Sequence, residues 1–216
     1  AHQSEYAMMD AMIPILSPSG VQEFLDLGLH GFAMSRFSGC WTGFKCVTMT
    51  VDSSASVYVD PHRVNIKAPH EFDLPDGGLN IRWPDIQLEQ ETRLHNFKLA
   101  AAQAYARSNQ LDQIVINKGP AKLGIVAAGK SYLDVRQAFA DLELDESDLI
   151  RLGIRVYKPA LVWPLEREQL REFARGLDEI LVIEEKRGLI EDQIKEILYN
   201  SSQRPKLILG KTNEDG

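Results

Sequence analysis

Residues 123–131 read LGIVAAGKS, an apolar run that ends in a glycine, a lysine and a serine. An apolar run without polar alternation is typical of a strand that helices cover on both faces, as in a parallel sheet. Further apolar runs follow it, separated by segments with helical periodicity. The expected strands are 123–128, 154–161, 180–183 and 206–209, and the expected helices are 132–142, 146–152, 165–175 and 191–199. This alternation predicts an α/β fold with a doubly wound, mostly parallel sheet over residues 120–216.

The same stretch also satisfies the spacing of a nucleotide-binding P-loop, Gly124-x-x-x-x-Gly129-Lys130-Ser131. A P-loop needs a strand before its first glycine and a loop whose backbone N–H groups surround the phosphates. The preceding residues, 117–122, have a poor strand sequence, whereas the residues between the two glycines are the best strand candidate of the region. We therefore expect Gly124 inside a strand, and a P-loop nucleotide hydrolase is the weaker alternative.

Two further segments each allow two interpretations. Gly129 would permit a turn while Ser131 caps the following helix; alternatively, this turn faces a cleft or a partner domain, because ligands of doubly wound sheets bind at the carboxyl ends of the strands. The charged run 184–187, EEKR, follows another expected strand. It is either a solvated turn or a contact between domains or subunits.

The first 119 residues have a different character. Residues 21–36 show helical periodicity, and 44–51 are rich in aromatic and β-branched residues, which predicts a strand. Prolines and a Pro-Asp-Gly-Gly turn then mark a connector, which ends in a long helix expected over 88–110. We expect three parts: 1–60, a connector at 61–119, and 120–216.

Composition excludes several classes of protein. The chain has 24 Lys and Arg against 31 Asp and Glu, a formal net charge of -7, which argues against a general nucleic-acid binder. Its two cysteines, Cys40 and Cys46, cannot form a disulfide framework, and no apolar stretch approaches the length of a membrane span. We expect a cytoplasmic protein without membrane or nucleic-acid partners. The five histidines show no metal-ligand spacing, so we assign no metal ligand and no catalytic residue.

Two stretches carry a resemblance to a known family. Residues 13–23 (IPILSPSGVQE) and 38–47 (SGCWTGFKCV) resemble the later part of the pyrimidine-side domain of the thiamine-diphosphate-dependent 2-oxoacid:ferredoxin oxidoreductases. Residues 124–132, 163–166 and 183–187 are similar to the transketolase C-terminal-like domain that follows it there. Within that family, the chain most resembles the fused bacterial indolepyruvate ferredoxin oxidoreductases.

The resemblance implies that residues 1–60 are the C-terminal part of the pyrimidine-binding domain and that the chain is a fragment of a longer enzyme. Such an enzyme decarboxylates an aryl pyruvate on thiamine diphosphate, reduces ferredoxin through iron–sulfur clusters and forms an aryl-acetyl-CoA. It implies thiamine diphosphate, Mg²⁺, [4Fe–4S] clusters and CoA as cofactors of the parent enzyme, none of them expected on this fragment alone. The implied partners are the remaining domains, ferredoxin and, in a homo-oligomer, further copies of the chain.

The family's diphosphate and magnesium motif and its cysteine quartets do not occur in this sequence. The resemblance places the activating glutamate before Ala1. His2-Gln3-Ser4-Glu5 is similar to a loop near the cofactor pocket, which makes Gln3 and Glu5 the candidate cofactor-binding residues. The alternative function is that of a subunit-packing or interaction domain.

Overall fold

The computed structural model describes residues 3–213. The N-terminal half contains α1 (Glu5–Asp10), β1 (Ile15–Leu16), α2 (Val21–Ser38), β2 (Gly43–Phe44) and α3 (Thr48–Val51). Residues 52–86, all described, contain no helix or strand. They lead to α4 (Gln87–Arg93), a π-helical turn η1 (Leu94–Lys98) and α5 (Leu99–Ser108), which follow one another without a break. This helical stretch corresponds to the long helix expected over 88–110.

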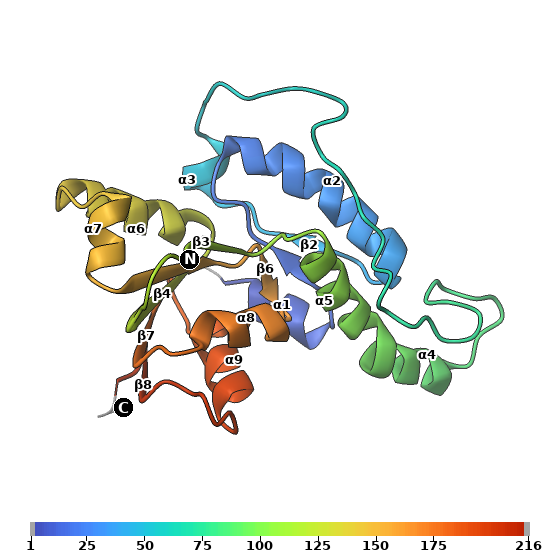
Figure 1. Cartoon of the computed structure of the whole chain (residues 1–216). Coiled ribbons are helices and arrows are strands. Elements are labelled where there is room, and N and C mark those ends of the chain that lie inside the picture. Colours follow the sequence, from blue (N-terminus) through green and yellow to red (C-terminus); the bar gives the residue numbers. More distant parts are fainter. Residues whose placement is uncertain (1–2, 214–216) are drawn as a thin grey trace.

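Strands and helices alternate in the C-terminal half (Figure 1). Its strands are β3 (Gln113–Ile116), β4 (Leu123–Ala127), β5 (Ile154–Lys158), β6 (Leu161–Trp163), β7 (Glu179–Ile183) and β8 (Leu207–Leu209). Its helices are α6 (Gly129–Asp141), α7 (Glu146–Arg151), α8 (Arg167–Ala174) and α9 (Leu189–Leu198). Among the described residues, no helix combines the length and the apolar character that crossing a membrane requires.

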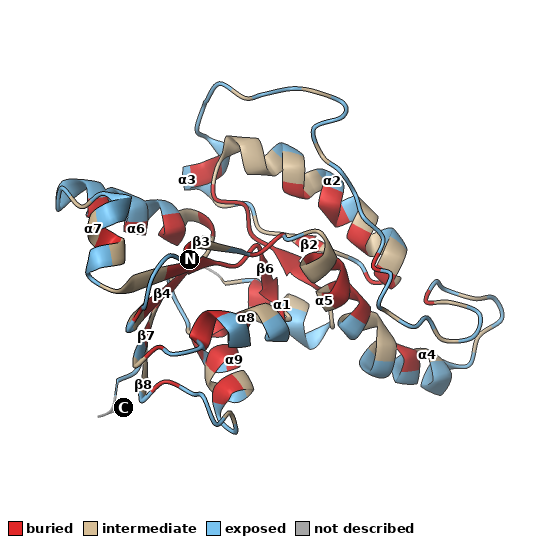
Figure 2. Ribbon diagram, viewed as in Figure 1, coloured by how far each residue is buried: buried red, intermediate tan, exposed pale blue. Residues whose placement is uncertain are grey.

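Five of these strands form one sheet in the order β3-β5-β4-β7-β8. β5, β4, β7 and β8 run parallel, and β3 is an antiparallel edge strand. Ile125 and Ala127 of β4 pack with α6 and α7, whereas Val126 packs with α8 and α9. Helices therefore cover both faces of the sheet, and the buried residues follow its strands and the inner sides of these helices (Figure 2). The predicted α/β fold with a doubly wound, mostly parallel sheet is confirmed.

β4 lies in the middle of this sheet, paired with β5 on one side and β7 on the other. Residues 124–127 are therefore extended and hydrogen-bonded to their neighbours, as expected. Gly124 lies within this strand, and only glycine fits there, because a Cβ would lie 2.5 Å from Leu177 and 2.7 Å from Phe173. A backbone fixed in this way does not wrap around a phosphate, so the P-loop motif is a coincidence of spacing.

A smaller sheet joins the two halves of the chain. β1 pairs with β2 in parallel and with β6 in antiparallel orientation. A second apolar core fills the space between this sheet, α2 and α5, and includes Leu16, Met34, Tyr105 and Leu161. The division into 1–60, 61–119 and 120–216 stays a prediction, and β6 shows that the first and last of these parts contact each other closely.

Two expected strands differ from the structure. The expected strand over 44–51 ends at Phe44, and Thr48–Val51 form the helical turn α3. The expected strand over 154–161 is divided at Pro159, whose missing N–H group breaks the ladder, so that β5 and β6 lie in different sheets.

Candidate functional site

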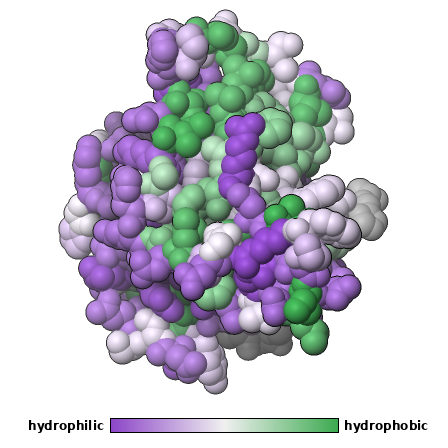
Figure 3. Space-filling model, turned by 90° about the vertical axis from the view of Figure 1, so that its right-hand side faces the viewer, coloured by the Kyte–Doolittle hydropathy of each residue, from purple (hydrophilic) through white to green (hydrophobic). Residues whose placement is uncertain are grey.

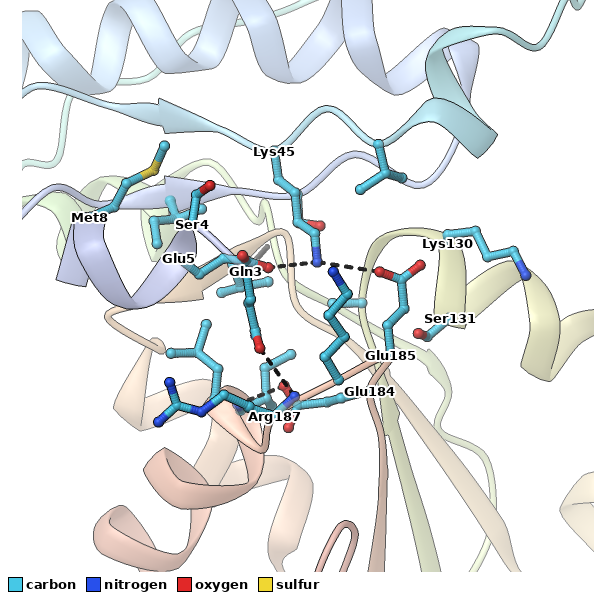
Figure 4. A pocket seen from close by; sticks show the side chains of 18 of the residues that line it. Gln3, Ser4, Glu5, Met8, Lys45, Lys130, Ser131, Glu184, Glu185 and Arg187 are labelled. Atoms are coloured by element: carbon cyan, nitrogen blue, oxygen red, sulfur yellow. Dashed lines mark hydrogen bonds and ion pairs between the residues drawn. The ribbon is translucent and has the colours of Figure 1, made fainter. Parts of the chain in front are cut away.

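A cleft of about 280 Å³ lies where the N-terminal segment meets the carboxyl ends of β4 and β7. Three groups of residues line it: 3–5 and 8 from the N-terminal segment and α1; 15, 17, 18 and 44–47 in and after β1 and β2; and 128, 130, 131, 162, 183–187, 189 and 190 from β6 and the ends of β4 and β7. The carboxyl ends of parallel strands are the usual ligand-binding edge of a doubly wound sheet. Figure 4 shows polar side chains from all three groups converging on this space.

The turn after β4 forms one wall of the cleft. Gly129 begins α6 with φ of 53°, and a Cβ on it would lie 2.6 Å from Oγ of Ser17. α6 has no side-chain N-cap, so the interpretation of Ser131 as the helix cap is wrong. The alternative is observed: Ser131 is 6% exposed and lines the cleft.

An ion pair of Lys45 connects the opposite walls. Its Nζ lies 2.7 Å from Oε1 of Glu5 in α1 and 3.9 Å from Oε2 of Glu185 after β7. Lys45 is positioned by the extension of β2, because its backbone N–H donates to the carbonyl oxygen of Leu16 at 2.8 Å. One ammonium group therefore neutralises carboxylates from both halves of the chain.

The charged run after β7 also contacts the N-terminal segment. The backbone N–H of Arg187 donates to Oε1 of Gln3 at 3.1 Å, and its guanidinium lies 3.7 Å from the centre of the Tyr6 ring. Partial burial raises the pKa of the Tyr6 phenol, while the charge of Arg187 acts in the opposite direction. Residues 184–187 therefore contact the other part of the chain, as one of the two interpretations proposed, while Glu185, Lys186 and Arg187 stay exposed as in a solvated turn.

Glu184 has a structural role within this wall. Its two carboxylate oxygens accept the backbone N–H groups of Ile190 and Glu191 at 2.9 and 3.0 Å, which satisfies donors of the first turn of α9. Burial raises the pKa of Glu184, and these two hydrogen bonds partly offset that effect.

The structure brings the two candidate residues Gln3 and Glu5 together at one end of the cleft, and their role at a cofactor stays a prediction. His2 lies outside the described residues. Sequence reasoning missed Lys45, which stood within an expected strand. No group of three His, Cys, Asp or Glu side chains in residues 3–213 is placed to hold a metal ion.

Comparison with known proteins agrees with this architecture. Residues 113–216 match the indolepyruvate oxidoreductase domain family. The IorA subunit of indolepyruvate oxidoreductase from Pyrococcus abyssi is 29% identical over 189 residues, and that from Pyrococcus horikoshii is 27% identical over 190 residues. Each match covers 86% of this chain, and the chain spans only 28% of the length of each relative.

A solved structure shows the same fold. The 2-oxoglutarate:ferredoxin oxidoreductase from Magnetococcus marinus, solved with 2-oxoglutarate, coenzyme A and succinyl-CoA bound, superposes with a TM-score of 0.50 at 13% identity. The superposition covers 91% of this chain and 38% of that one. The resemblance stated from the sequence is thus confirmed: residues 113–216 match the indolepyruvate oxidoreductase domain family, and most of the chain is similar to one part of the IorA subunits.

Proposed function

We propose that this chain is one part of an enzyme that oxidatively decarboxylates indolepyruvate or another aryl pyruvate. The observation that carries the proposal is the match to indolepyruvate oxidoreductase subunits over 86% of the chain. In the overall reaction the bond between the keto carbon and the carboxylate breaks and a thioester to CoA forms. Carbon dioxide, a proton and an electron pair are released, and the electrons pass to ferredoxin.

The described residues do not provide a complete site for the cofactors of such an enzyme. They contain no ligand set for Mg²⁺ or for an iron–sulfur cluster. Thiamine diphosphate, where bound, supplies the group on which the decarboxylation occurs. We assign no step of the reaction to this chain, and we propose that the remaining domains of the longer enzyme hold these groups.

The chain's own contribution is then a polar wall. Gln3 and Glu5 present an amide and a carboxylate at the end of the cleft, and we propose that this end borders the thiamine pocket. Lys45 forms an ion pair with Glu5, and a backbone hydrogen bond to Leu16 holds the main chain from which the Lys45 side chain extends.

The test uses the complete enzyme that contains this chain. Reduction of a viologen dye is measured with indolepyruvate, phenylpyruvate and 2-oxoglutarate in the presence of CoA. Preference for the two aryl substrates is expected. Preference for 2-oxoglutarate, or no CoA-dependent reduction with any of the three, would contradict the proposal.

A second role is favoured by an exposed apolar segment. Ile81, Trp83 and Leu88 are 83%, 96% and 73% exposed, near the start of α4. Figure 3 looks onto the side of the molecule that carries α4, where apolar side chains are exposed. We propose that this segment packs against a second copy of the chain, since exposed apolar side chains that gather into one patch mark interaction sites.

Light scattering tests this second role. The chain is expected to dimerise at high concentration, and Trp83→Ser is expected to shift it towards monomer, whereas Tyr199→Ser, at another exposed aromatic, leaves the dimer intact. A chain that stays monomeric at high concentration would contradict the role.

A further inference from the structure

The amino end of α6 opens into the cleft without a partner. The first three N–H groups of a helix have no acceptor within it, and neither a capping side chain nor a turn carbonyl among the described residues accepts from Gly129, Lys130 or Ser131. Such an end carries a partial positive charge and attracts anions. α6 has 13 residues, so its dipole is fully developed at this end.

Two serine side chains accompany these N–H groups. Ser131 and Ser17 are 6% and 4% exposed as residues, and both line the cleft. Neither hydroxyl oxygen belongs to the buried polar atoms of the described residues that lack a partner, so these hydroxyls are reached from the cleft. Figure 4 shows the Ser131 side chain directed from α6 towards the cleft. Ser17 lies against the same helix end, as its Oγ would be 2.6 Å from a Cβ on Gly129.

The charge of the cleft also suits an anion. The chain as a whole is acidic, with a formal net charge of -7, whereas the charged side chains directed at the cleft balance, because Lys130 pairs with Asp134 outside it. The cationic ones are Lys45, Lys186 and Arg187, and the acidic ones are Glu5, Glu184 and Glu185. The oxygens of Glu184 accept hydrogen bonds from α9, and Lys45 lies between the other two carboxylates.

We propose that the first turn of α6, with the hydroxyls of Ser17 and Ser131, binds the phosphate group of a phosphate ester. The cleft of about 280 Å³ leaves room beside the phosphate for an organic group, and Met8, Phe44 and Val47 give that group an apolar wall. This inference goes beyond the proposed function and does not depend on it, because it concerns binding by this chain alone.

The proposed site is distinct from a P-loop. Residues 124–127 stay in β4, and the ammonium of Lys130 pairs with Asp134 at 2.6 Å on the helix surface instead of reaching into the cleft. Figure 4 shows Lys130 directed away from the cleft. The contacts come from backbone N–H groups and hydroxyls, which recognise a single phosphate group without positioning it for hydrolysis.

The test is a titration of the ¹⁵N-labelled chain with phenyl phosphate, inorganic phosphate and benzoate, followed by amide resonances. We expect the resonances of residues 129–131 to move with both phosphates, with phenyl phosphate the tighter ligand. Equal affinity for the two phosphates would support the phosphate site and refute the apolar wall. Resonances that do not move, or that move equally with benzoate, would overturn the proposal.

Two variants sharpen the result. Ser131→Ala is expected to weaken phenyl phosphate about tenfold, because a hydrogen bond to a charged group is lost. Ser131→Asp places a carboxylate in the anion position and is expected to abolish the phosphate response. Ser147→Ala, the same change in α7 outside the cleft, serves as the control and is expected to leave affinity unchanged. Unchanged affinity in Ser131→Ala would also overturn the proposal.

Discussion

The ammonium nitrogen of Lys45 lies 2.7 Å from a carboxylate oxygen of Glu5, which joins α1 to the strand extension that follows β2. The Glu5 side chain is 10% exposed and that of Lys45 29% exposed. Because the pair is partly buried, removing one partner leaves a charged side chain that water solvates poorly. Its loss therefore lowers the free energy of unfolding more than the loss of a surface pair does. The pair therefore fixes the end of the cleft where Gln3 and Glu5 meet.

Replacing Glu5 tests how much the ion pair with Lys45 stabilises the fold. Glu5→Gln is expected to lower the free energy of unfolding by about 1–2 kcal/mol, measured by urea denaturation. The control is Glu146→Gln, which removes the exposed pair with Lys118 and is expected to cost less than about 0.5 kcal/mol. An equal decrease in the free energy of unfolding for the two variants would contradict this expectation, because the pair in the cleft would then stabilise the fold no more than the exposed pair does.

A buried carboxylate predicts a pH dependence. Burial raises the pKa of Asp112 to about 6 from its usual 3.8, although Tyr157, Ala160 and Leu161 all donate hydrogen bonds to it. Between pH 3.8 and 6 the folded state keeps a proton that the unfolded state has lost, so stability falls as pH rises through this window. Asp112→Asn has no such titration. The stability of the parent chain relative to this variant should therefore decrease by about 2 kcal/mol from pH 4 to pH 7.

Asp178 provides a contrast of opposite sign. A hydrogen bond from Lys122 lowers the pKa of this exposed carboxyl. The ionised Asp178 side chain stabilises the folded state at neutral pH, and this stabilisation is lost as the pH falls and the carboxyl takes up a proton. The parent chain should therefore lose stability relative to Asp178→Asn on acidification. If the stability of the parent chain relative to its Asn variant changed with pH in the same direction at Asp112 and at Asp178, burial could not be the cause of the raised pKa of Asp112.

Two glycines predict opposite effects of a methyl group. Gly124→Ala is expected to destabilise by about 1–3 kcal/mol, because the new Cβ would overlap Leu177 and Phe173. At Gly28, inside α2, no neighbouring atom lies within 4 Å of the position that a Cβ would take, so Gly28→Ala should stabilise by about 1 kcal/mol through helix propensity. Thermal unfolding of both variants checks this pair, and destabilisation by Gly28→Ala would refute the helix geometry.

The strands of the large sheet were predictable because each is a continuous apolar run, a pattern that indicates a strand without knowledge of its neighbours. Residues 123–127 are apolar on both faces, and helices cover both faces in the structure. The stretch 44–51 has an equally good strand composition, but its partner β1 is only two residues long. Pairing ends with the bond from Lys45 to Leu16, and Thr50 Oγ1 donates to the Val47 carbonyl in a helical turn. The sequence of residues 44–51 carries no information about the length of the strand with which they pair.

The cleft was only partly predictable for a similar reason. Gln3 and Glu5 were found by resemblance, whereas the ion pair of Glu5 with Lys45 spans 40 residues and depends on how β1 and β2 align. The sequence offered a helix-capping role for Ser131, which fails because α6 begins two residues earlier, at Gly129. Contacts between residues that are far apart in the sequence can be identified only once the fold is known.

The most direct measurement of the central claim, that this chain supplies one wall of a larger catalytic site, is made on the chain alone. Purified chain is mixed with thiamine diphosphate, Mg²⁺, indolepyruvate and CoA, cofactor binding is followed by calorimetry, and viologen reduction is recorded. The account predicts no dye reduction, and binding of thiamine diphosphate no stronger than that of phenyl phosphate. Sustained dye reduction by the isolated chain would contradict it.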